Sequence, residues 1–163
     1  MIIIMTIELR YLEINDYNMG FMELLKQLTE VTDISYEFYE TQFFELNNNT
    51  FIIVGVIDNK IVATGTIIIK SNFYRNCKNT GFIEDIVVSK NHRGKGYSTL
   101  IINKLKELAK KNNCYKIILD CKKEYYKFYK KFGFKKNKNL NLELRFYEEN
   151  IKPPIPPCTT KTL

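Results

Sequence analysis

The chain has 163 residues, of which 45% are hydrophobic, and a formal net charge of +7. The length fits one domain, and the hydrophobic content is typical of a globular protein and excludes a disordered one. The sequence contains no run of about eighteen apolar residues, and its apolar start is too short for a secretory signal. We therefore expect no membrane span and a cytoplasmic protein.

A basic protein can bind nucleic acid, so the distribution of the positive charge matters. The lysines are spread over residues 104–116 and 122–138, are mixed with Glu107 and Glu124, and accompany no nucleic-acid-binding motif. This pattern fits solvated helix faces, although the same field would attract anionic small molecules. We expect small anionic substrates and no nucleic-acid partner.

The cysteines and the single histidine do not form a metal-binding pattern. Four cysteines occur without a C-x-x-C pair, and His92 is the one histidine. A zinc site would need closer ligand pairs, so we expect no metal. Cys114 and Cys121 bracket an apolar stretch and are predicted to be small core residues.

The first half of the chain predicts a strand, two helices and a β-hairpin. Asp16 can cap a helix whose apolar residues recur at helical spacing, and Asp33 or Ser35 can open a second helix. Turn residues at 58–60 separate two runs rich in β-branched residues, which indicates a hairpin. The expected elements are a strand over 2–12, a helix from 16 to 28, a helix from 33 or 35 to 46, and strands over 51–56 and 61–69.

Residues 81–100 read as a strand, a basic turn and a helix start. Ile83 and the run 86–88 are apolar, and helical spacing begins at Leu100. Between them lies the turn Arg93-Gly-Lys-Gly96. Glycines at a helix start let backbone N–H groups approach an anion closely, and the helix dipole favours negative charge there. The stretch therefore predicts an anion site suited to a diphosphate.

Two common phosphate-binding patterns do not fit this turn. A P-loop would need Gly at position 89 and Ser or Thr at position 96, where the chain has Ser89 and Gly96. A dinucleotide fingerprint would need a third glycine three residues after Gly96, and Thr99 stands there. From the residues alone, a lysine-rich turn that binds nothing remains the alternative.

The second half of the chain predicts a strand, a helix and a last strand before a proline-rich tail. The strand covers residues 116–120, the helix over 124–132 ends at Gly133, and the last strand covers 140–147. The four prolines between residues 153 and 157 make the tail unsuited to a sheet. We expect one domain over residues 1–147, built as a mixed sheet with packed helices, and a tail over 148–163 outside the sheet.

The basic turn also resembles the acetyl-CoA pyrophosphate loop of the GNAT acetyltransferase superfamily, Gln/Arg-x-x-Gly-x-Gly/Ala. Arg93, Gly96 and Ser98 occupy its fixed positions, and Ser98 departs from the pattern. Three longer strings resemble one GNAT family, glucosamine-6-phosphate N-acetyltransferase. They are Ile83-Glu-Asp-Ile-Val-Val88, Cys114-Tyr-Lys-Ile-Ile-Leu-Asp-Cys121 and Phe128-Tyr-Lys-Lys-Phe-Gly-Phe134.

The resemblance implies the GNAT fold of the α/β (α+β) class, with a mixed, mostly antiparallel central sheet flanked by helices. Two central strands, here around 83–88 and 116–120, would splay apart and admit acetyl-CoA, and an N–H near Ile86 could polarise the thioester carbonyl. The residues it assigns to acetyl-CoA are Ile86, Val87, Val88, His92, Arg93, Gly94, Lys95, Gly96, Tyr97, Ser98 and Tyr129.

The implied chemistry is direct attack of an amine on the thioester. Tyr129 matches the family tyrosine that donates to the departing sulfur, although its spacing with Tyr125, Phe128 and Phe132 also fits a core stripe. Asp120 resembles the residue that orients the amine, and Glu84 and Asp85 resemble those that hold sugar hydroxyls or accept the proton. For these three carboxylates, hydrogen bonding at strand ends and helix caps is the alternative.

The resemblance assigns the sugar phosphate to Thr29, Arg75 and Arg145, with Asn72 and Lys116 as weaker candidates. Arg75 and Asn72 stand where histidine and lysine are common in the family, and Tyr125 stands where an asparagine often contacts CoA. Family members are homodimers with sites at the subunit junction, which we expect here as well.

We therefore expect transfer of an acetyl group from acetyl-CoA to the 2-amine of glucosamine 6-phosphate, a step toward UDP-N-acetylglucosamine. One alternative is another GNAT enzyme that acts on a protein or on a small amine. A second alternative is a non-enzymatic module that binds acetyl-CoA.

Overall fold

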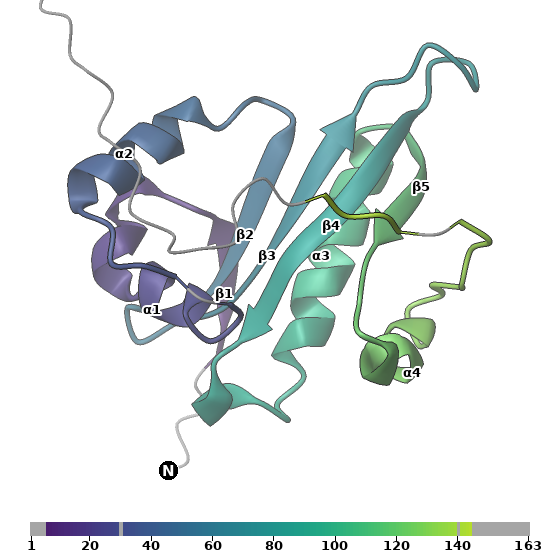
Figure 1. Ribbon diagram of the computed structural model, residues 1–163. Coiled ribbons are helices and arrows are strands. Elements are labelled where there is room, and N and C mark those ends of the chain that lie inside the picture. The colour runs from purple at the N-terminus through teal and green to yellow at the C-terminus, as the bar shows by residue number, and fades with distance from the viewer. Residues whose placement is uncertain (1–5, 30, 140, 145–163) are drawn as a thin grey trace, which may run out of the picture.

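The structure is a computed structural model that describes residues 6–29, 31–139 and 141–144. Its centre is a five-stranded sheet in which the strands lie in chain order, β1 to β5 (Figure 1). The first three pairings are antiparallel, and β4 pairs with β5 in parallel. The strands are β1 (Glu8–Tyr11), β2 (Thr50–Ile57), β3 (Lys60–Lys70), β4 (Asn79–Val88) and β5 (Cys114–Leu119). The predicted mixed, mostly antiparallel sheet is confirmed.

Helices cover both faces of this sheet. The long helix α3 (Tyr97–Lys111) packs its buried residues Ile101 and Leu105 on one face, against Ile53 of β2. Since neighbouring residues of a strand face opposite sides, Val54 points to the other face and packs there with Phe21 and Leu24. The helices on that face are α1 (Phe21–Leu25) and α2 (Tyr36–Glu45), and α4 (Tyr126–Lys130) lies beside β5 (Figure 1).

The predicted hairpin and second helix are confirmed. Asp58 and Asn59 both have a positive φ, 48° and 57°, which is the two-residue turn geometry that joins antiparallel strands tightly. Ser35 caps α2, because its side-chain oxygen accepts a hydrogen bond from the backbone N–H of Phe38.

The strands β4 and β5 separate halfway along β4. Their pairing runs from Asn79 with Cys114 to Ile83 with Leu119 and then ends. Next to this point β4 carries a bulge, since Thr64 and Thr66 of β3 pair with Val87 and Glu84, which places two β4 residues opposite one. Asp85, inside the bulge, has a φ of 54°. The predicted splay of the central strands is thereby confirmed.

The predicted helix capped by Asp16 is wrong. Residues Ile14–Met19 form the 3-10 helix η1, and Gly20, at a φ of 84°, separates it from the short α1. Asp16 is fully buried inside η1, where it accepts two hydrogen bonds from the Arg10 guanidinium, at 2.8 and 2.7 Å. A third hydrogen bond, from the backbone N–H of Glu13, holds the same carboxylate. Asp16 therefore belongs to the capping box of η1, in which Glu13 is the N-cap residue, and also forms a buried ion pair with Arg10.

Three other predicted elements have different bounds. The strand expected over 2–12 is β1, Glu8–Tyr11, and residues 1–5 lie outside the described residues. The helix expected over 124–132 is divided into η3 (Lys123–Tyr125) and α4, and Gly133 follows with a φ of 90°. Of the strand expected over 140–147, the described residues 141–144 are not in a strand, and the rest of it and the tail over 148–163 lie outside the described residues.

Candidate active site

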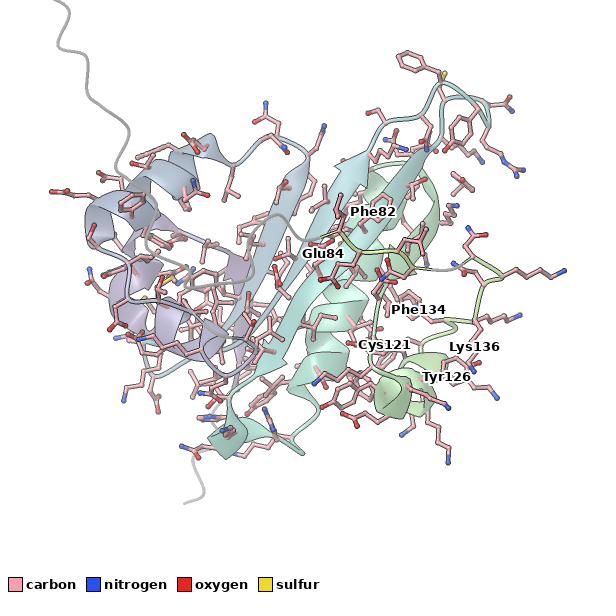
Figure 2. All side chains as sticks on the ribbon, in the orientation of Figure 1. Phe82, Glu84, Cys121, Tyr126, Phe134 and Lys136 are labelled. Carbon is pink, nitrogen blue, oxygen red and sulfur yellow. The ribbon has the colours of Figure 1, made fainter. Side chains whose placement is uncertain are left out.

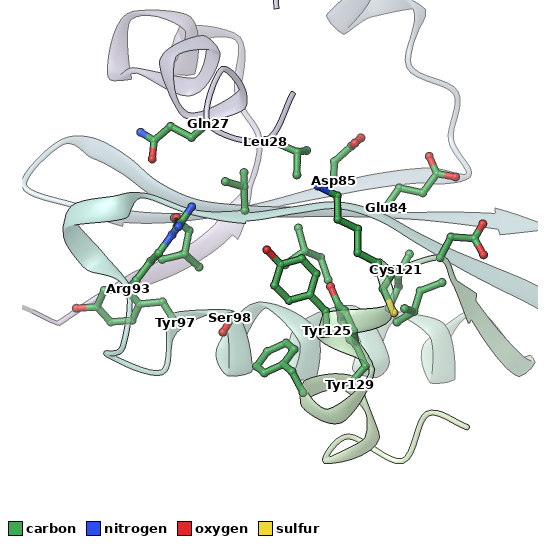
Figure 3. Close-up of a pocket in the computed structure, with 18 of the residues that line it drawn as sticks. Gln27, Leu28, Glu84, Asp85, Arg93, Tyr97, Ser98, Cys121, Tyr125 and Tyr129 are labelled. Carbon is green, nitrogen blue, oxygen red and sulfur yellow. Dashed lines mark hydrogen bonds between the residues drawn. The ribbon is translucent and has the colours of Figure 1, made fainter. Parts of the chain in front are cut away.

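A cavity of about 560 Å³ lies where β4 and β5 separate (Figure 3). Its walls come from the second half of β4, the turn before α3, the segment after β5, and α4. It brings together most of the predicted site residues, which lie far apart in the sequence. Those that line it are Glu84, Asp85, Ile86, Val87, Val88, Arg93, Gly94, Gly96, Tyr97, Ser98, Asp120 and Tyr129.

The turn before α3 forms the basic end of the cavity. Gly94 and Gly96 have φ values of 78° and 81°, a conformation that favours glycine, and a Cβ added to either would meet nothing within 4 Å. Glycine is therefore required by the backbone path and not by crowding. The Arg93 side chain folds back so that its Nε donates to the carbonyl of Val88 at 3.2 Å. The 15-residue helix α3 starts here, so its first N–H groups and its dipole favour an anion at this end.

The wall formed by β4 offers backbone groups to a ligand. Among the described residues, this strand has no partner on the β5 side beyond Ile83, and Ile86, Val87 and Val88 line the opening. An extended ligand that enters between the strands can therefore hydrogen bond to β4 in place of β5. The bulge at Asp85 turns the backbone just before Ile86, which is where the predicted carbonyl-polarising N–H lies.

Tyr129 reaches the cavity from α4. Its ring is half-buried and packs edge-on against Phe128 and Phe134, at centroid distances of 5.1 and 6.1 Å. Desolvation, helped by nearby Cys121 and Tyr125, raises the pKa of the Tyr129 hydroxyl above its ordinary value. The phenol therefore stays protonated at neutral pH and keeps a proton to donate. In the segment that follows α4, the Lys136 ammonium group lies 5.1 Å from the centroid of the Tyr126 ring and so contacts the helix (Figure 2).

Three carboxylates form the acidic end of the cavity. Glu84 and Asp85 come from the bulged part of β4, and Asp120 directly follows β5. Desolvation raises the pKa of Asp85, although part of its surface stays open to solvent. Figure 3 shows Glu84 and Asp85 on one wall and Tyr125 and Tyr129 on the opposite wall. A ligand held here would meet proton acceptors on one side and a phenol on the other.

Several predicted ligand-binding residues are not in this cavity. His92 and Lys95 belong to the basic turn but do not line the opening, and His92 instead lies against the Tyr97 ring. Thr29 follows Leu28, which does line it. Asn72, Arg75 and Lys116 lie elsewhere in the described chain, and Arg145 lies outside the described residues.

Arg75 and Lys116 instead form a basic cluster at the far end of the β4–β5 pair. Both cations lie over the ring of Tyr115, at 5.7 and 5.3 Å from its centroid. Lys116 pairs with Thr80, four residues before Glu84, which is about 13 Å along the strand. The nearby Asn72 is buried and donates to the Thr80 hydroxyl at 3.0 Å. None of Arg75, Lys116 and Asn72 lines the cavity of its own chain.

Sequence reasoning missed some of the cavity wall. Gln27 and Leu28 close one side, and only the family resemblance at the neighbouring Thr29 pointed to that segment. Cys121 was predicted to be a core residue, which is wrong, because its side chain is exposed and lines the cavity. The neighbouring Lys122 also lines it. The available signal was the end of the strand near Leu119, because residues that follow the end of a strand leave the sheet and can line a cavity beside it.

The comparisons with known proteins agree with this geometry. Residues 18–134 match the Acetyltransferase (GNAT) family. The chain is 40% identical over 139 residues to glucosamine 6-phosphate N-acetyltransferase 1 of Dictyostelium discoideum, covering 80% of this chain and 85% of the relative. It is 38% identical over 146 residues to the Arabidopsis thaliana glucosamine 6-phosphate N-acetyltransferase, covering 86% of this chain and 97% of the relative.

A solved structure gives the same result. The crystal structure of glucosamine-6-phosphate N-acetyltransferase from Arabidopsis thaliana superposes with a TM-score of 0.82 at 37% identity, and the match covers 87% of this chain and 99% of that chain. The chain therefore belongs to the GNAT acetyltransferase family and, within it, to the family of the glucosamine 6-phosphate N-acetyltransferases.

Proposed function

We propose that this protein transfers the acetyl group of acetyl-CoA to the 2-amine of glucosamine 6-phosphate. One observation carries the proposal: a single cavity joins a diphosphate-type anion site at one end to three carboxylates and a protonated tyrosine at the other. The relatives that are 38–40% identical to it over the aligned residues are glucosamine 6-phosphate N-acetyltransferases, which supports this acceptor.

The cavity fits the shape and charge of acetyl-CoA. The pyrophosphate would lie on the N–H groups at the start of α3, close to Arg93. The pantetheine arm would run between the separated strands and pair with the backbone of residues 86–88. This arrangement places the thioester beside the bulge at Asp85, where an N–H donor aimed at the carbonyl oxygen is typically worth about 3 kcal/mol of the barrier.

The residues at the acidic end account for the proton transfers. Asp120 would orient the acceptor amine, and Glu84 or Asp85 would accept the proton that nitrogen loses, directly or through water, as the new C–N bond forms. Tyr129 would protonate the sulfur as the C–S bond breaks. No acyl-enzyme is needed, because holding both reactants in one cavity can supply roughly 7–11 kcal/mol.

We further propose that the enzyme is a homodimer whose partner subunit supplies Arg75 and Lys116 to the sugar phosphate. Two observations support a dimer: these cations lie away from the cavity of their own chain, and the side chains of Leu142 and Leu144 are 86% and 77% exposed. Apolar side chains this exposed mark a surface that another protein surface can cover. A phosphate on the sugar would then meet positive charge across the subunit junction.

The decisive experiment is a thiol-release assay with acetyl-CoA and a panel of hexosamines with and without phosphate. We expect glucosamine 6-phosphate to give the highest kcat/KM and to exceed free glucosamine by at least about tenfold, because a charged hydrogen bond lost from a phosphate costs 1.5–3 kcal/mol. Equal rates would refute the phosphate site. Turnover with a peptide amine but not with glucosamine 6-phosphate would refute the proposed acceptor.

A further inference from the structure

The side chain of Gln27 joins two segments that line the cavity from different parts of the fold. Its Oε1 accepts a hydrogen bond from the backbone N–H of Lys90 at 2.9 Å, across 63 residues of sequence. Gln27 follows α1 and lines the cavity beside Leu28. Lys90 is the first residue of the 3-10 helix η2 (Lys90–His92), directly before the basic turn. One hydrogen bond therefore ties the α1 side of the cavity to the start of the predicted pyrophosphate loop.

This bond satisfies a backbone group that would otherwise lack a partner. The first N–H groups of a helical turn have no intrahelical acceptor, and Ser89, which precedes η2, makes no side-chain capping bond. Gln27 supplies the missing acceptor from a remote part of the chain. Two further bonds fix the same stretch: the N–H of Ser89 donates to Val62 at 2.8 Å, and Arg93 donates to Val88 at 3.2 Å.

Gln27 is itself held in place by the core. Its N–H donates to the carbonyl of Leu24 at 3.0 Å, and the Leu24 side chain is buried against the same cluster as Val87 of β4. On its other side, the chain continues into Leu28 and Thr29, the predicted contact for the sugar phosphate. The far end of this segment is fixed where the Tyr17 hydroxyl donates to the carbonyl of Ile34 at 2.8 Å. Gln27 therefore lies between the buried cluster that contains Leu24 and the segment that is predicted to contact the sugar phosphate.

We propose that Gln27 is a positioning residue that couples binding of the acceptor to binding of the CoA substrate. This inference rests on the function proposed above. A sugar substrate that contacts the segment after Gln27 would restrict the motion of that segment and so hold Oε1 of Gln27 in place. The loop that binds the pyrophosphate would then be ordered before CoA binds. Because coupling between two binding sites is reciprocal, CoA would strengthen acceptor binding by the same factor.

The coupling can be measured with CoA itself, which lacks the acetyl group and cannot react. Calorimetry would give the Kd of CoA alone and with saturating glucosamine 6-phosphate. For the natural chain we expect the Kd to fall by about three- to tenfold when the sugar is present, the range of one ordinary hydrogen bond. Gln27→Met keeps the length of the side chain but removes its acceptor. We expect Gln27→Met to bind CoA about three- to tenfold more weakly and to show no effect of the sugar.

A backbone variant tests the same bond from the other side. Lys90→Pro removes the N–H donor, and proline suits this position, because it is the first of the turn and follows a residue with an extended ψ of 135°. Lys90→Ala removes the same side chain but keeps the N–H, so it is the matched control. We expect Lys90→Pro to behave like Gln27→Met and Lys90→Ala to behave like the natural chain. The double variant should bind CoA no more weakly than either single variant.

The results separate this inference from the proposed function. Additive losses in the double variant, or coupling that survives Gln27→Met, would overturn the role of Gln27, and thermal melting would verify that each variant is folded. Turnover of glucosamine 6-phosphate without any dependence of CoA binding on Gln27 would likewise overturn the inference alone. Dependence of CoA binding on Gln27 without turnover of that sugar would refute the proposed acceptor instead.

Discussion

At the residue scale, Tyr129 is the side chain whose chemistry is easiest to isolate. Tyr129→Phe keeps the ring contacts with Phe128 and Phe134 and removes only the hydroxyl. We expect kcat to fall by about 10²-fold, the low end for general-acid catalysis, since a thiol with a pKa of about 8.5 already leaves readily. The Kd of acetyl-CoA should stay within about twofold. Steady-state kinetics and calorimetry check the two expectations.

The control for this change is Tyr126→Phe. Tyr126 belongs to the same helix, but its ring lies under Lys136 and does not line the cavity. The same loss of a hydroxyl there should leave kcat unchanged. If Tyr129→Phe retains the natural kcat, Tyr129 serves only as part of the aromatic packing around α4.

Asp85 gives a prediction on pH and stability. Its pKa in the folded protein is raised above the ordinary value of 3.8, because desolvation disfavours the charged form. The folded state therefore binds this proton more tightly than the unfolded state does. The free energy of unfolding gained from protonated Asp85 is lost as the pH rises through the raised pKa. At neutral pH the charged carboxylate is a net cost to stability, reduced by its contact with solvent.

Asp85→Asn should remove that cost. Asparagine tolerates the φ of 54° at this position nearly as well as aspartate, so the backbone of the bulge is kept. We expect the variant to melt at a higher temperature than the natural chain at pH 7. The difference should shrink as the pH falls through the raised pKa and below 3.8, where the carboxyl is protonated in both the folded and the unfolded state. A constant difference in Tm across this range would contradict the role of desolvation.

At the element scale, Gly65 of β3 lets α3 pack closely on the sheet. Gly65 lies opposite the bulge, and a Cβ added to it would come within 2.6 Å of Ile101 Cγ2 and 3.1 Å of Leu105 Cδ1. Both residues are fully buried on α3, and the Cγ2 methyl of isoleucine is attached directly to a stiff Cβ. The helix would have to move away from the sheet to admit the extra methyl group.

We therefore expect Gly65→Ala to lower the free energy of unfolding by about 1–3 kcal/mol, the usual cost of overpacking a core. Gly81→Ala is the matched control on β4, since its Cβ would meet Ile67 Cδ1, the flexible end of a side chain, at 3.0 Å. Urea unfolding of both variants measures the difference. Equal losses would mean that the gap at Gly65 does not set the distance between α3 and the sheet.

The elements that sequence could predict are those whose signal is local. The hairpin at Asp58 and Asn59, the cap at Ser35 and the start of α3 after the basic turn each follow from residues close together in the chain. The failures have tertiary causes. Asp16 resembles a helix cap, but Arg10, six residues earlier, draws its carboxylate into a buried ion pair. The bulge at Asp85 depends on register with β3, and alternation along β4 alone does not reveal it.

At the scale of the whole molecule, the sequence predicted which chemistry is present better than how it is arranged. The basic turn, the carboxylates and Tyr129 share one cavity, as their assignment to one site requires. The segment with Gln27 was missed, because its contribution is a hydrogen bond to Lys90 across the fold and no local pattern encodes it. Arg75 and Lys116 were assigned to the same site, yet their own chain holds them over Tyr115, away from the cavity.

The position of Arg75 leads to a test by subunit mixing. A Tyr129→Phe chain keeps Arg75, and an Arg75→Ala chain keeps Tyr129. If the partner subunit supplies Arg75, both sites are defective in a homodimer of either variant. In a mixture refolded at equal amounts, half of the dimers are mixed, and each mixed dimer regains one intact site. We expect about a quarter of the natural activity at subsaturating sugar phosphate, well above the mean of the two separate variants. If the activity of the mixture equals this mean, Arg75 acts in the site of its own chain or has no role in catalysis. If sedimentation velocity shows a monomer, the shared site is excluded.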